Sequence, residues 1–278
     1  MTEKVINSST EKNEGNKFEK LSIQVSLNGL SFCVIDTITD TVTNSGKVRF
    51  KAPSTPYLVQ KELKSLLEDK DVIGRTYTDI SVVHKNNLFA LVPKDLFDEN
   101  ELPNYLKMNT KLLAHDHIVF DEISTLDIIN VYVPLVNVNN YLFSLFGEFE
   151  FKHSGTVLIQ TLVSQKNTSR DPVCYAYLTE RTIEVVILKQ KRLLFYNHFQ
   201  YHTKEDFLYY ILFTFEQLEL DAETTALKMF GQVEEDDAVF KLCQDYISKV
   251  AVFVPSGPSY LIESDSGQSI DFTILSAL

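Results

Sequence analysis

Glycine is scarce in this sequence, and tryptophan is absent. Nine glycines occur in 278 residues, roughly half the usual share. Loops that cradle phosphates depend on glycine, because a residue without a side chain lets backbone amides approach the phosphate closely. The sequence contains neither a G-x-x-x-x-G-K-[ST] loop nor a G-x-G-x-x-G turn. These two nucleotide-binding motifs are therefore excluded.

Cysteines and long apolar runs are also few. Cys33, Cys174 and Cys243 lie far apart in apolar stretches, which predicts buried, reduced thiols and a reducing, cytoplasmic location. No apolar run approaches the roughly 20 residues of a membrane helix, and residues 1–20 lack the apolar stretch of a secretory signal. We therefore expect no membrane insertion, and a disordered tail over residues 1–20.

Positive charge is in deficit, with 26 Lys and Arg against 38 Asp and Glu and a net charge of -12. A chain this acidic lacks the electrostatic field that drives non-specific phosphate binding, so we expect no nucleic-acid partner. The densest basic stretch, Lys189 to Arg192, coincides with an expected hairpin turn and is interpreted as solvated. Hydrophobic residues make up 44% of the chain, which is enough for a packed core.

The first half of the chain begins with a predicted β-hairpin. Leu21 to Asp36 alternates apolar and polar residues around Asn28-Gly29, a dipeptide that strongly favours a two-residue hairpin turn. Pro56 suits the first turn of a helix that follows. The further predicted elements are a strand, an amphipathic helix and two strands: Lys47–Lys51, Thr55–Asp69, Asp79–Val83 and Leu88–Val92.

The same order returns after Arg170. Val173 to Leu188 is again predicted as a hairpin, turning at Thr179-Glu180-Arg181. Thr203 and Asp206 resemble a capping box at the start of a strongly apolar helix. The further predicted elements are a strand, a helix, a strand, a helix and a strand: Leu193–Phe199, Lys204–Leu220, Ala226–Phe230, Asp236–Ser248 and Lys249–Val254.

The two halves match at an offset of about 151 residues, since Leu27 falls on Leu178. Three antiparallel strands that lead into a helix and further strands form a specific order, which predicts a duplicated α/β unit with mixed sheets. Between the copies we expect a strand in Asp127–Leu135, a helix over Asn139–Phe146, a strand over Phe149–Lys152 and a helix over Thr156–Gln165. The predicted organisation is a first lobe over 21–165, a linker over 166–172 and a second lobe over 173–278.

This duplicated plan resembles the actin-like ATPase fold, which is built from two ribonuclease-H-like lobes that face a cleft. Val131 to Phe151 resembles the strand, helix, glycine and strand of cytoplasmic pilus-assembly and secretion proteins in that superfamily, with Pro134 and Gly147 in the matching places. From Leu21 to about Val254 the chain also resembles an uncharacterised bacterial family thought to share this fold. The resemblance implies two ribonuclease-H-like lobes in this chain.

Superfamily members that use ATP carry glycine in two hairpins, in a pattern similar to Asp-x-Gly. Here the first hairpin has Gly29 without an Asp two positions before it, and the second turn, at Glu180, has neither residue. A third feature, a Gly-Gly turn, is represented by Gly231 alone. The resemblance implies cleft candidates at Asn28, Gly29, Glu180 and Gly231. The missing residues imply a degenerate member that needs no cofactor, with ATP and Mg²⁺ as the alternative.

Histidines suggest two metal sites, neither of which we predict. His115 and His117 flank an aspartate, but no third ligand is fixed by spacing, so we interpret them as part of an exposed turn. His198 and His202 stand at a strand end and before a capped helix, where Asp206 is better explained as the capping acid. No Ser-His-Asp or Cys-His arrangement is evident, and no catalytic residue is predicted.

Aromatic residues crowd one stretch of the second half, and they are Phe195, Tyr196, Phe199, Tyr201, Phe207, Tyr209, Tyr210, Phe213 and Phe215. One interpretation is a helix buried on both sides within its own lobe. The other is that Tyr209, Tyr210 and Phe213 face a partner, because tyrosine-rich surfaces favour interfaces.

Two function classes remain open from the sequence. The leading hypothesis is a non-catalytic actin-like scaffold or adaptor that acts through a protein partner or as a homo-oligomer. The alternative is a nucleotide-binding ATPase or a ligand-sensing switch with a rewired cleft around the candidate turns.

Overall fold

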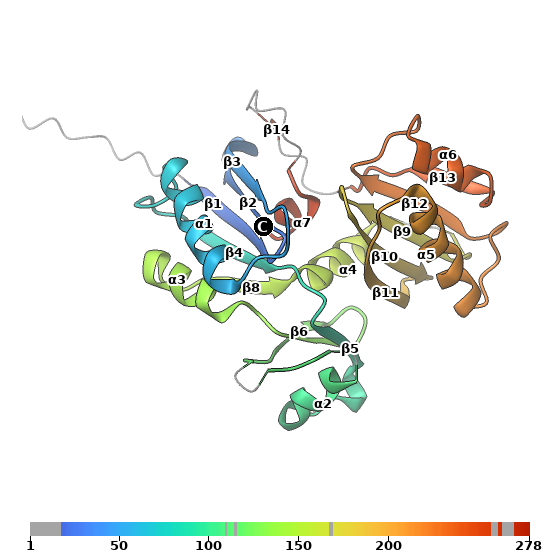
Figure 1. Ribbon diagram of the computed structural model, residues 1–278, viewed down its shortest axis with the longest axis horizontal. Coiled ribbons are helices and arrows are strands. Elements are labelled where there is room, and N and C mark those ends of the chain that lie inside the picture. The colour runs from blue at the N-terminus through green and yellow to red at the C-terminus, as the bar shows by residue number, and fades with distance from the viewer. Residues whose placement is uncertain (1–17, 109, 114–115, 167–168, 257–260, 263–269) are drawn as a thin grey trace, which may run out of the picture.

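The structure is a computed structural model that describes residues 18–108, 110–113, 116–166, 169–256, 261–262 and 270–278. Two lobes lie side by side, and a smaller unit sits below them (Figure 1). Most of the tail predicted over 1–20 falls outside the described residues, as do 167 and 168 of the predicted linker.

The first lobe is built on a six-stranded mixed sheet in the order β14-β3-β2-β1-β4-β8. Its strands are β1 (Glu19–Ser26), β2 (Gly29–Asp36), β3 (Thr41–Arg49), β4 (Asp79–His84), β8 (Glu150–His153) and β14 (Leu261–Ile262). β1 and β2 form the predicted hairpin, and β4 joins β1 in parallel. The predicted third strand is present but begins six residues earlier, at Thr41 rather than Lys47.

Helices cover both faces of this sheet. α1 (Pro56–Asp69) and α3 (Val136–Phe146) pack on the face that carries Leu21, Ile23 and Phe32. α1 begins after Thr55, whose hydroxyl accepts a hydrogen bond from the amide of Leu58, and Pro56 stands in its first turn as predicted. On the opposite face lies α7 (Phe272–Ser276), a short helix that the sequence analysis did not anticipate.

A third sheet forms the smaller unit, and it was not expected from the sequence. β5 (Phe89–Pro93), β7 (Ile128–Tyr132) and β6 (Val119–Ile123) pair antiparallel in that order. Helix α2 (Leu102–Lys107) and 3₁₀ turns at Lys94–Leu96 and Glu99–Glu101 accompany it. Its core contains Leu106, Ile129 and Val131. The strand predicted at Leu88–Val92 therefore exists, but it pairs outside the first lobe's sheet.

The second lobe repeats the plan with a five-stranded sheet in the order β11-β10-β9-β12-β13. Its strands are β9 (Val173–Leu178), β10 (Thr182–Lys189), β11 (Arg192–Gln200), β12 (Ala226–Gly231) and β13 (Lys249–Val252). α5 (Lys204–Gln217) and α6 (Ala238–Gln244) cover one face, and α4 (Ser154–Ser164) covers the other. α6 is shorter than predicted at both ends, because a turn over 234–237 precedes it and a further turn follows Gln244.

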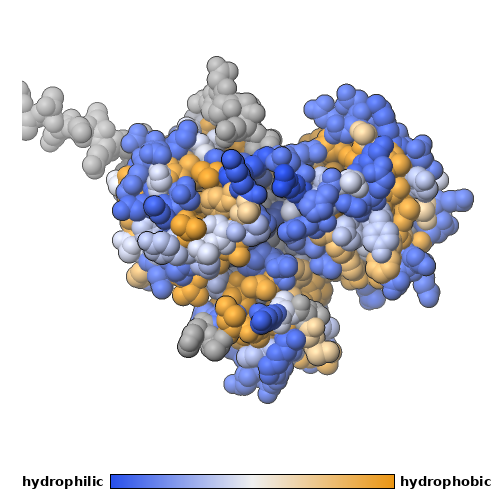
Figure 2. All heavy atoms as spheres, viewed as in Figure 1, coloured by the Kyte–Doolittle hydropathy of each residue, from blue (hydrophilic) through white to orange (hydrophobic). Residues whose placement is uncertain are grey.

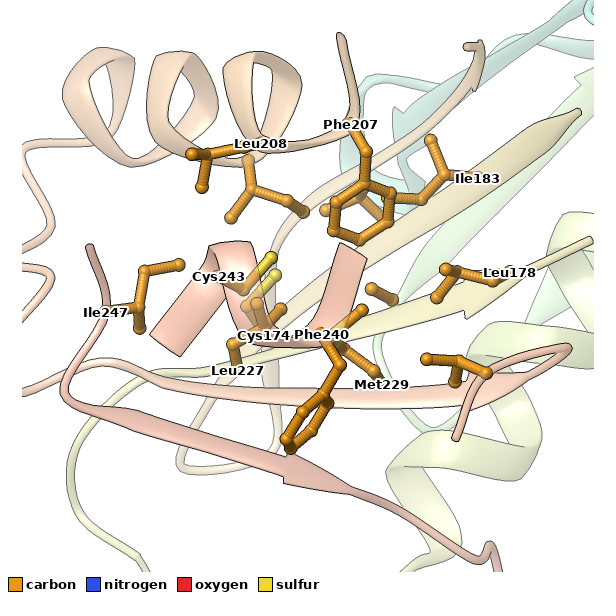
Figure 3. Packing of buried hydrophobic residues seen from close by; sticks show 14 of the residues in the cluster. Cys174, Leu178, Ile183, Phe207, Leu208, Leu227, Met229, Phe240, Cys243 and Ile247 are labelled. Atoms are coloured by element: carbon orange, nitrogen blue, oxygen red, sulfur yellow. The ribbon is translucent and has the colours of Figure 1, made fainter. Parts of the chain in front are cut away.

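Figure 3 shows the core between α5, α6 and the second sheet, where Phe207 lies beside Ile183 and Cys174 beside Cys243. Burial of each large apolar side chain here contributes about 1.5–3 kcal/mol. All three cysteines of the chain are free and buried, as predicted. Burial raises the pKa of the Cys33 and Cys243 thiols to about 12, so these thiols are not activated.

The C-terminal residues pack mainly on the first lobe. Ile274 joins Cys33, Ile35 and Val42 in a small core on the side of the first sheet that faces the second lobe. The sequence analysis placed residues 173–278 with the second lobe, yet residues 270–278 lie between the two (Figure 1). The reason is physical: β2 exposes apolar residues on both faces, and each face needs a covering element. In the described part of the chain, no helix is long and apolar enough to cross a membrane.

Candidate functional site at the inter-lobe junction

The candidate residues lie on three turns where the lobes meet. Gly29 begins β2 and pairs with Arg49 at the end of β3. The Arg49 guanidinium forms an ion pair with the carboxylate of Glu180 in the β9–β10 turn. Gly231 ends β12 and pairs with the last residue of β9. The structure therefore brings Gly29, Glu180 and Gly231 to the same edge of the junction, while Asn28 occupies an exposed turn beside them.

The first turn uses its own side chain to satisfy its backbone amides. The hydroxyl of Ser26 accepts hydrogen bonds from the amides of Asn28 (3.1 Å) and Gly29 (3.0 Å) and donates to the carbonyl of Gly29 (2.9 Å). A Cβ on Gly29 would lie 2.6 Å from the carbonyl oxygen of Val48. Close approach of β3 therefore explains this glycine without a ligand.

The second turn is closed in a similar way. The amide of Thr179 donates to the carbonyl of Thr182 at 2.9 Å, and the two threonine hydroxyls lie 2.6 Å apart. The hydroxyl of Tyr201 donates to the carbonyl of Thr179 at 2.8 Å. The backbone of this turn is held by groups of its own lobe, and the Glu180 side chain pairs with Arg49 of the first lobe.

Gly231 is required by the backbone of the neighbouring strand. Its φ is +95°, and a Cβ there would lie 2.3 Å from the carbonyl oxygen of Leu178 and 2.8 Å from the ring of Tyr177. The same carbonyl accepts a hydrogen bond from the amide of Gln232 at 2.9 Å. Both the conformation and the space at this position thus favour glycine.

A second ion pair joins the lobes. The ammonium of Lys85, which follows β4, lies 2.5 Å from Oε2 of Glu184 on β10. The side chains are 14% and 1% exposed, so the pair is largely shielded from water. Tyr196 donates its hydroxyl to Oε1 of Glu184 at 2.9 Å, and the ammonium of Lys85 lies 5.2 Å from the ring centre of Tyr177.

The electrostatics of this cluster favour one charge state. Burial opposes ionisation of Glu184, but Lys85, His198 and the bond from Tyr196 hold the pKa of its carboxyl below its usual range. Burial lowers the pKa of His153 and of His198 to about 4. Both imidazoles are therefore neutral at pH 7, and Glu184 is paired chiefly with Lys85.

The C-terminal segment completes the junction. Asp271 forms an ion pair with Lys47 of β3 at 2.7 Å. The amide of Phe272 donates to the hydroxyl of Tyr177 at 3.2 Å, and the Phe272 ring lies 5.3 Å from that of Phe230. In Figure 2 hydrophilic residues gather on the viewed face where the two lobes meet.

Among the described residues, the histidines of the two pairs are not grouped with further metal ligands. His198 lies on β11, and the amide of His202 donates to Asp206, which forms the predicted capping box with Thr203. The Asp116 carboxylate accepts a hydrogen bond from the amide of Leu113 within a turn, and His115 lies outside the described residues. Among the residues that the structure describes, no three His, Cys, Asp or Glu side chains are grouped to hold a metal ion.

Protein groups already bond to several of the backbone amides at the three turns. The amides of Asn28 and Gly29 at the first turn bond to Ser26, and those of Thr179 at the second turn and of Gln232 bond to backbone carbonyls. The junction beside them is spanned by the Lys85–Glu184 pair and by Asp271 and Phe272. A phosphate chain would need these amides and this space.

Sequence reasoning missed the residues that connect the lobes. Lys85, Glu184 and Asp271 belong to no motif, and their partners are distant in the chain. One signal was available: Glu184 is the one charge inside the strand TIEVVILK, whose other charge, Lys189, is its exposed last residue. A charge in a buried strand needs a partner. Its partner could not be identified from spacing.

Comparisons with known proteins agree with the architecture. The sequence matches a protein family of unknown function (DUF3822) over residues 8–250. Among curated protein sequences, no relative matches this chain.

Two solved structures are similar over most of the chain. One is a Bacteroides thetaiotaomicron protein with an actin-like ATPase fold and unknown function, at 19% identity and a TM-score of 0.75, covering 85% of this chain and 91% of that one. Another is the PilM–PilN type IV pilus biogenesis complex, at 10% identity and a TM-score of 0.59, covering 89% and 91%. The chain therefore has the actin-like ATPase fold, and the predicted fold and resemblance are confirmed.

Proposed function

Because this chain belongs to the DUF3822 family and has an actin-like ATPase fold, we propose that it acts as a scaffold or adaptor through protein contacts. In this proposal it neither binds nor hydrolyses nucleotide and works in the cytoplasm, where its three buried thiols stay reduced. Fold alone does not decide between an enzyme and a scaffold, so the proposal rests on the junction.

The observation that supports the proposal is that protein groups bond to amides of the candidate turns and to each other across the junction. Ser26 caps the first turn, and Lys85 and Glu184 connect the lobes through a shielded pair. A nucleotide-binding member needs open glycine-rich turns there, because its backbone amides must reach the ligand.

A surface of aromatic residues supports the protein-contact part of the proposal. Tyr209 and Phe213 of α5 are 59% and 44% exposed, and their rings stack at 5.7 Å. Tyr210 beside them is half-buried against Phe199. α5 thus buries Phe207 and its neighbours in the core but exposes an aromatic stripe, which is typical of interfaces. The PilM–PilN likeness adds support, because that structure is a complex of two proteins.

Calorimetric titration tests the first part. The chain is titrated with Mg-ATP, Mg-ADP and Mg-GTP, and we expect no binding heat at concentrations up to millimolar. Micromolar binding of any of the three would contradict the proposal. Phosphate release above background in a coupled assay would instead support the nucleotide-switch alternative.

The contact surface is tested by a matched pair of variants. Tyr209→Ala with Phe213→Ala removes the stripe, whereas Tyr57→Ala removes an aromatic side chain that is 72% exposed on the first lobe. We expect only the α5 variant to lose co-purifying partners or self-association, measured by cross-linking and light scattering. Equal behaviour of the two variants would argue against this surface.

A further inference from the structure

The carboxylate of Asp271 is held by donors from three adjacent strands. The ammonium of Lys47 on β3 lies 2.7 Å from Oδ1, the hydroxyl of Ser31 on β2 donates to Oδ2 at 2.9 Å, and the amide of Gln24 on β1 donates to Oδ2 at 3.3 Å. The side chains of Lys47 and Asp271 are 19% and 11% exposed. Three convergent donors in a shielded place form a site suited to a carboxylate.

Buried polar residues lie beside the apolar ones on the sheet face around this site. Ser22, Gln24 and Ser31 are 0%, 8% and 5% exposed, so three polar residues are buried on one face of the β1–β2 hairpin. Buried polar groups need partners. Gln24 and Ser31 find theirs in Asp271, and the side chain of Gln24 also accepts a hydrogen bond from the hydroxyl of Thr273 at 2.5 Å.

Phe272, which lies between Asp271 and Thr273 in the chain, contacts the other lobe. Phe272 packs its ring 6.1 Å from Tyr177 on β9 and 5.3 Å from Phe230 on β12, and its amide bonds to the hydroxyl of Tyr177. Within three consecutive residues, two side chains therefore bind the first sheet while the middle one binds the second. A small cavity of about 10 Å³ borders Asp271 and Lys47.

We propose that Gln24, Ser31 and Lys47 form a carboxylate-binding site whose ligand is the chain's own segment, residues 271–273. The segment acts as a built-in peptide ligand that fixes the lobes relative to each other. Its carboxylate is the counter-ion of Lys47, and its phenylalanine supplies the apolar contact to the second lobe. This inference does not depend on the scaffold role, since it concerns only how the lobes are joined.

Chemical rescue tests the site with the full-length chain. Asp271→Ala removes the carboxylate, enlarges the neighbouring cavity and leaves Lys47 without its counter-ion. We expect a lower thermal midpoint for this variant, and partial recovery in sodium acetate but not in sodium chloride of equal ionic strength. The wild type should show no difference between the two salts.

Two controls identify the site. In Asp271→Ala with Lys47→Met, acetate should give no recovery beyond chloride, because the cation that binds it is gone. Asp79→Ala breaks the more exposed pair with Lys20, whose atoms lie 3.2 Å apart, and should also show no specific recovery. Equal midpoints of Asp271→Ala in acetate and chloride would overturn the carboxylate site.

A second variant covers the case in which Asp271→Ala does not fold. Asp271→Asn keeps the size of the side chain and removes its charge. Hydrogen exchange at residues 272–276 should become at least tenfold faster than in the wild type, while exchange in α1 stays unchanged. Unchanged protection of residues 272–276 would contradict the role of Asp271 in holding the segment.

Discussion

Glu184 shows how one buried charge connects two lobes. It is 1% exposed in a strand of apolar residues, and its partner Lys85 comes from the other lobe at 2.5 Å. Removing an ionised carboxylate from water costs several kcal/mol unless a close partner and hydrogen bonds compensate. Lys85 and Tyr196 provide that compensation, so the charge is stable only when the lobes are together.

The first prediction concerns this pair. Lys85→Met should lower the free energy of unfolding by about 3–5 kcal/mol, because it leaves Glu184 buried and unpaired. Urea denaturation followed by circular dichroism measures the loss. Adding Glu184→Gln should recover much of it. Lys94→Met, which breaks the exposed pair with Glu122, should change stability little, and an equal loss there would refute the explanation.

The second prediction concerns Gly231. Gly231→Ala must adopt a positive φ and also clash with the carbonyl of Leu178. Gly74→Ala is the matched control, because its φ is +82° but nothing lies within 4 Å of the added Cβ. The control should lose about 1–2 kcal/mol, and Gly231→Ala about 1–3 kcal/mol more. Similar losses, measured by urea denaturation, would show that the close contact is unimportant.

At the level of elements, hydrophobic periodicity predicted most of the helices and strands. Both hairpins, α1, α5 and the capping box of α5 are found where the pattern placed them. α2 and α7 were missed. α7 has five residues, which is too short for a periodic signal, and β5 pairs with β7 across a long separation that local patterns do not encode.

The third prediction concerns the start of α5. Thr203 accepts a hydrogen bond from the amide of Asp206, and the Asp206 carboxylate accepts one from the amide of Thr203. Thr203→Ala should therefore lower the free energy of unfolding by about 1 kcal/mol. Glu205→Ala, in the same turn but outside the box, should have a much smaller effect. Equal denaturation midpoints for Thr203→Ala and wild type would contradict the role of the cap.

For the whole molecule, the duplicated order of strands and helices predicted two lobes of actin-like fold, which the structural likeness confirms. The sequence predicted the function less fully than the fold, because the prediction rested on glycines and acids that are missing rather than on residues that are present. The contacts between lobes could not be predicted. Lys85 and Glu184 are 99 positions apart in the printed numbering, and Lys47 and Asp271 are 224 apart. Only the folded chain brings them together.

Two buried histidines make the stability of the whole chain depend on pH. His84 and His153 are 0% exposed, and burial lowers the pKa of each to about 4. The His84 ring accepts a hydrogen bond from the amide of Leu135 and forms another with the side chain of Asn139. The His153 ring accepts a hydrogen bond from the amide of Gly155 and forms another with the backbone carbonyl of Asn86. Each ring is therefore held in its neutral form.

The fourth prediction follows from the sign of these shifts. Between pH 6.5 and about 4 the unfolded chain binds protons that the folded chain excludes, so stability falls as the pH decreases. From pH 7.5 to 5.5 each of the two histidines should cost about 1 kcal/mol. His84→Gln should reduce the pH dependence by that amount in urea denaturation at the two pH values. An unchanged pH dependence in this variant would refute the assignment.

The central claim is that side chains of the protein, rather than a nucleotide, fix the two lobes relative to each other. Spin labels at Lys61→Cys on α1 and Glu216→Cys on α5 report the distance between lobes, because both positions are exposed and the native cysteines are buried. Pulsed electron resonance should give one narrow distance distribution that Mg-ATP at millimolar concentration leaves unchanged. A distribution that shifts or narrows on addition of Mg-ATP would contradict the claim.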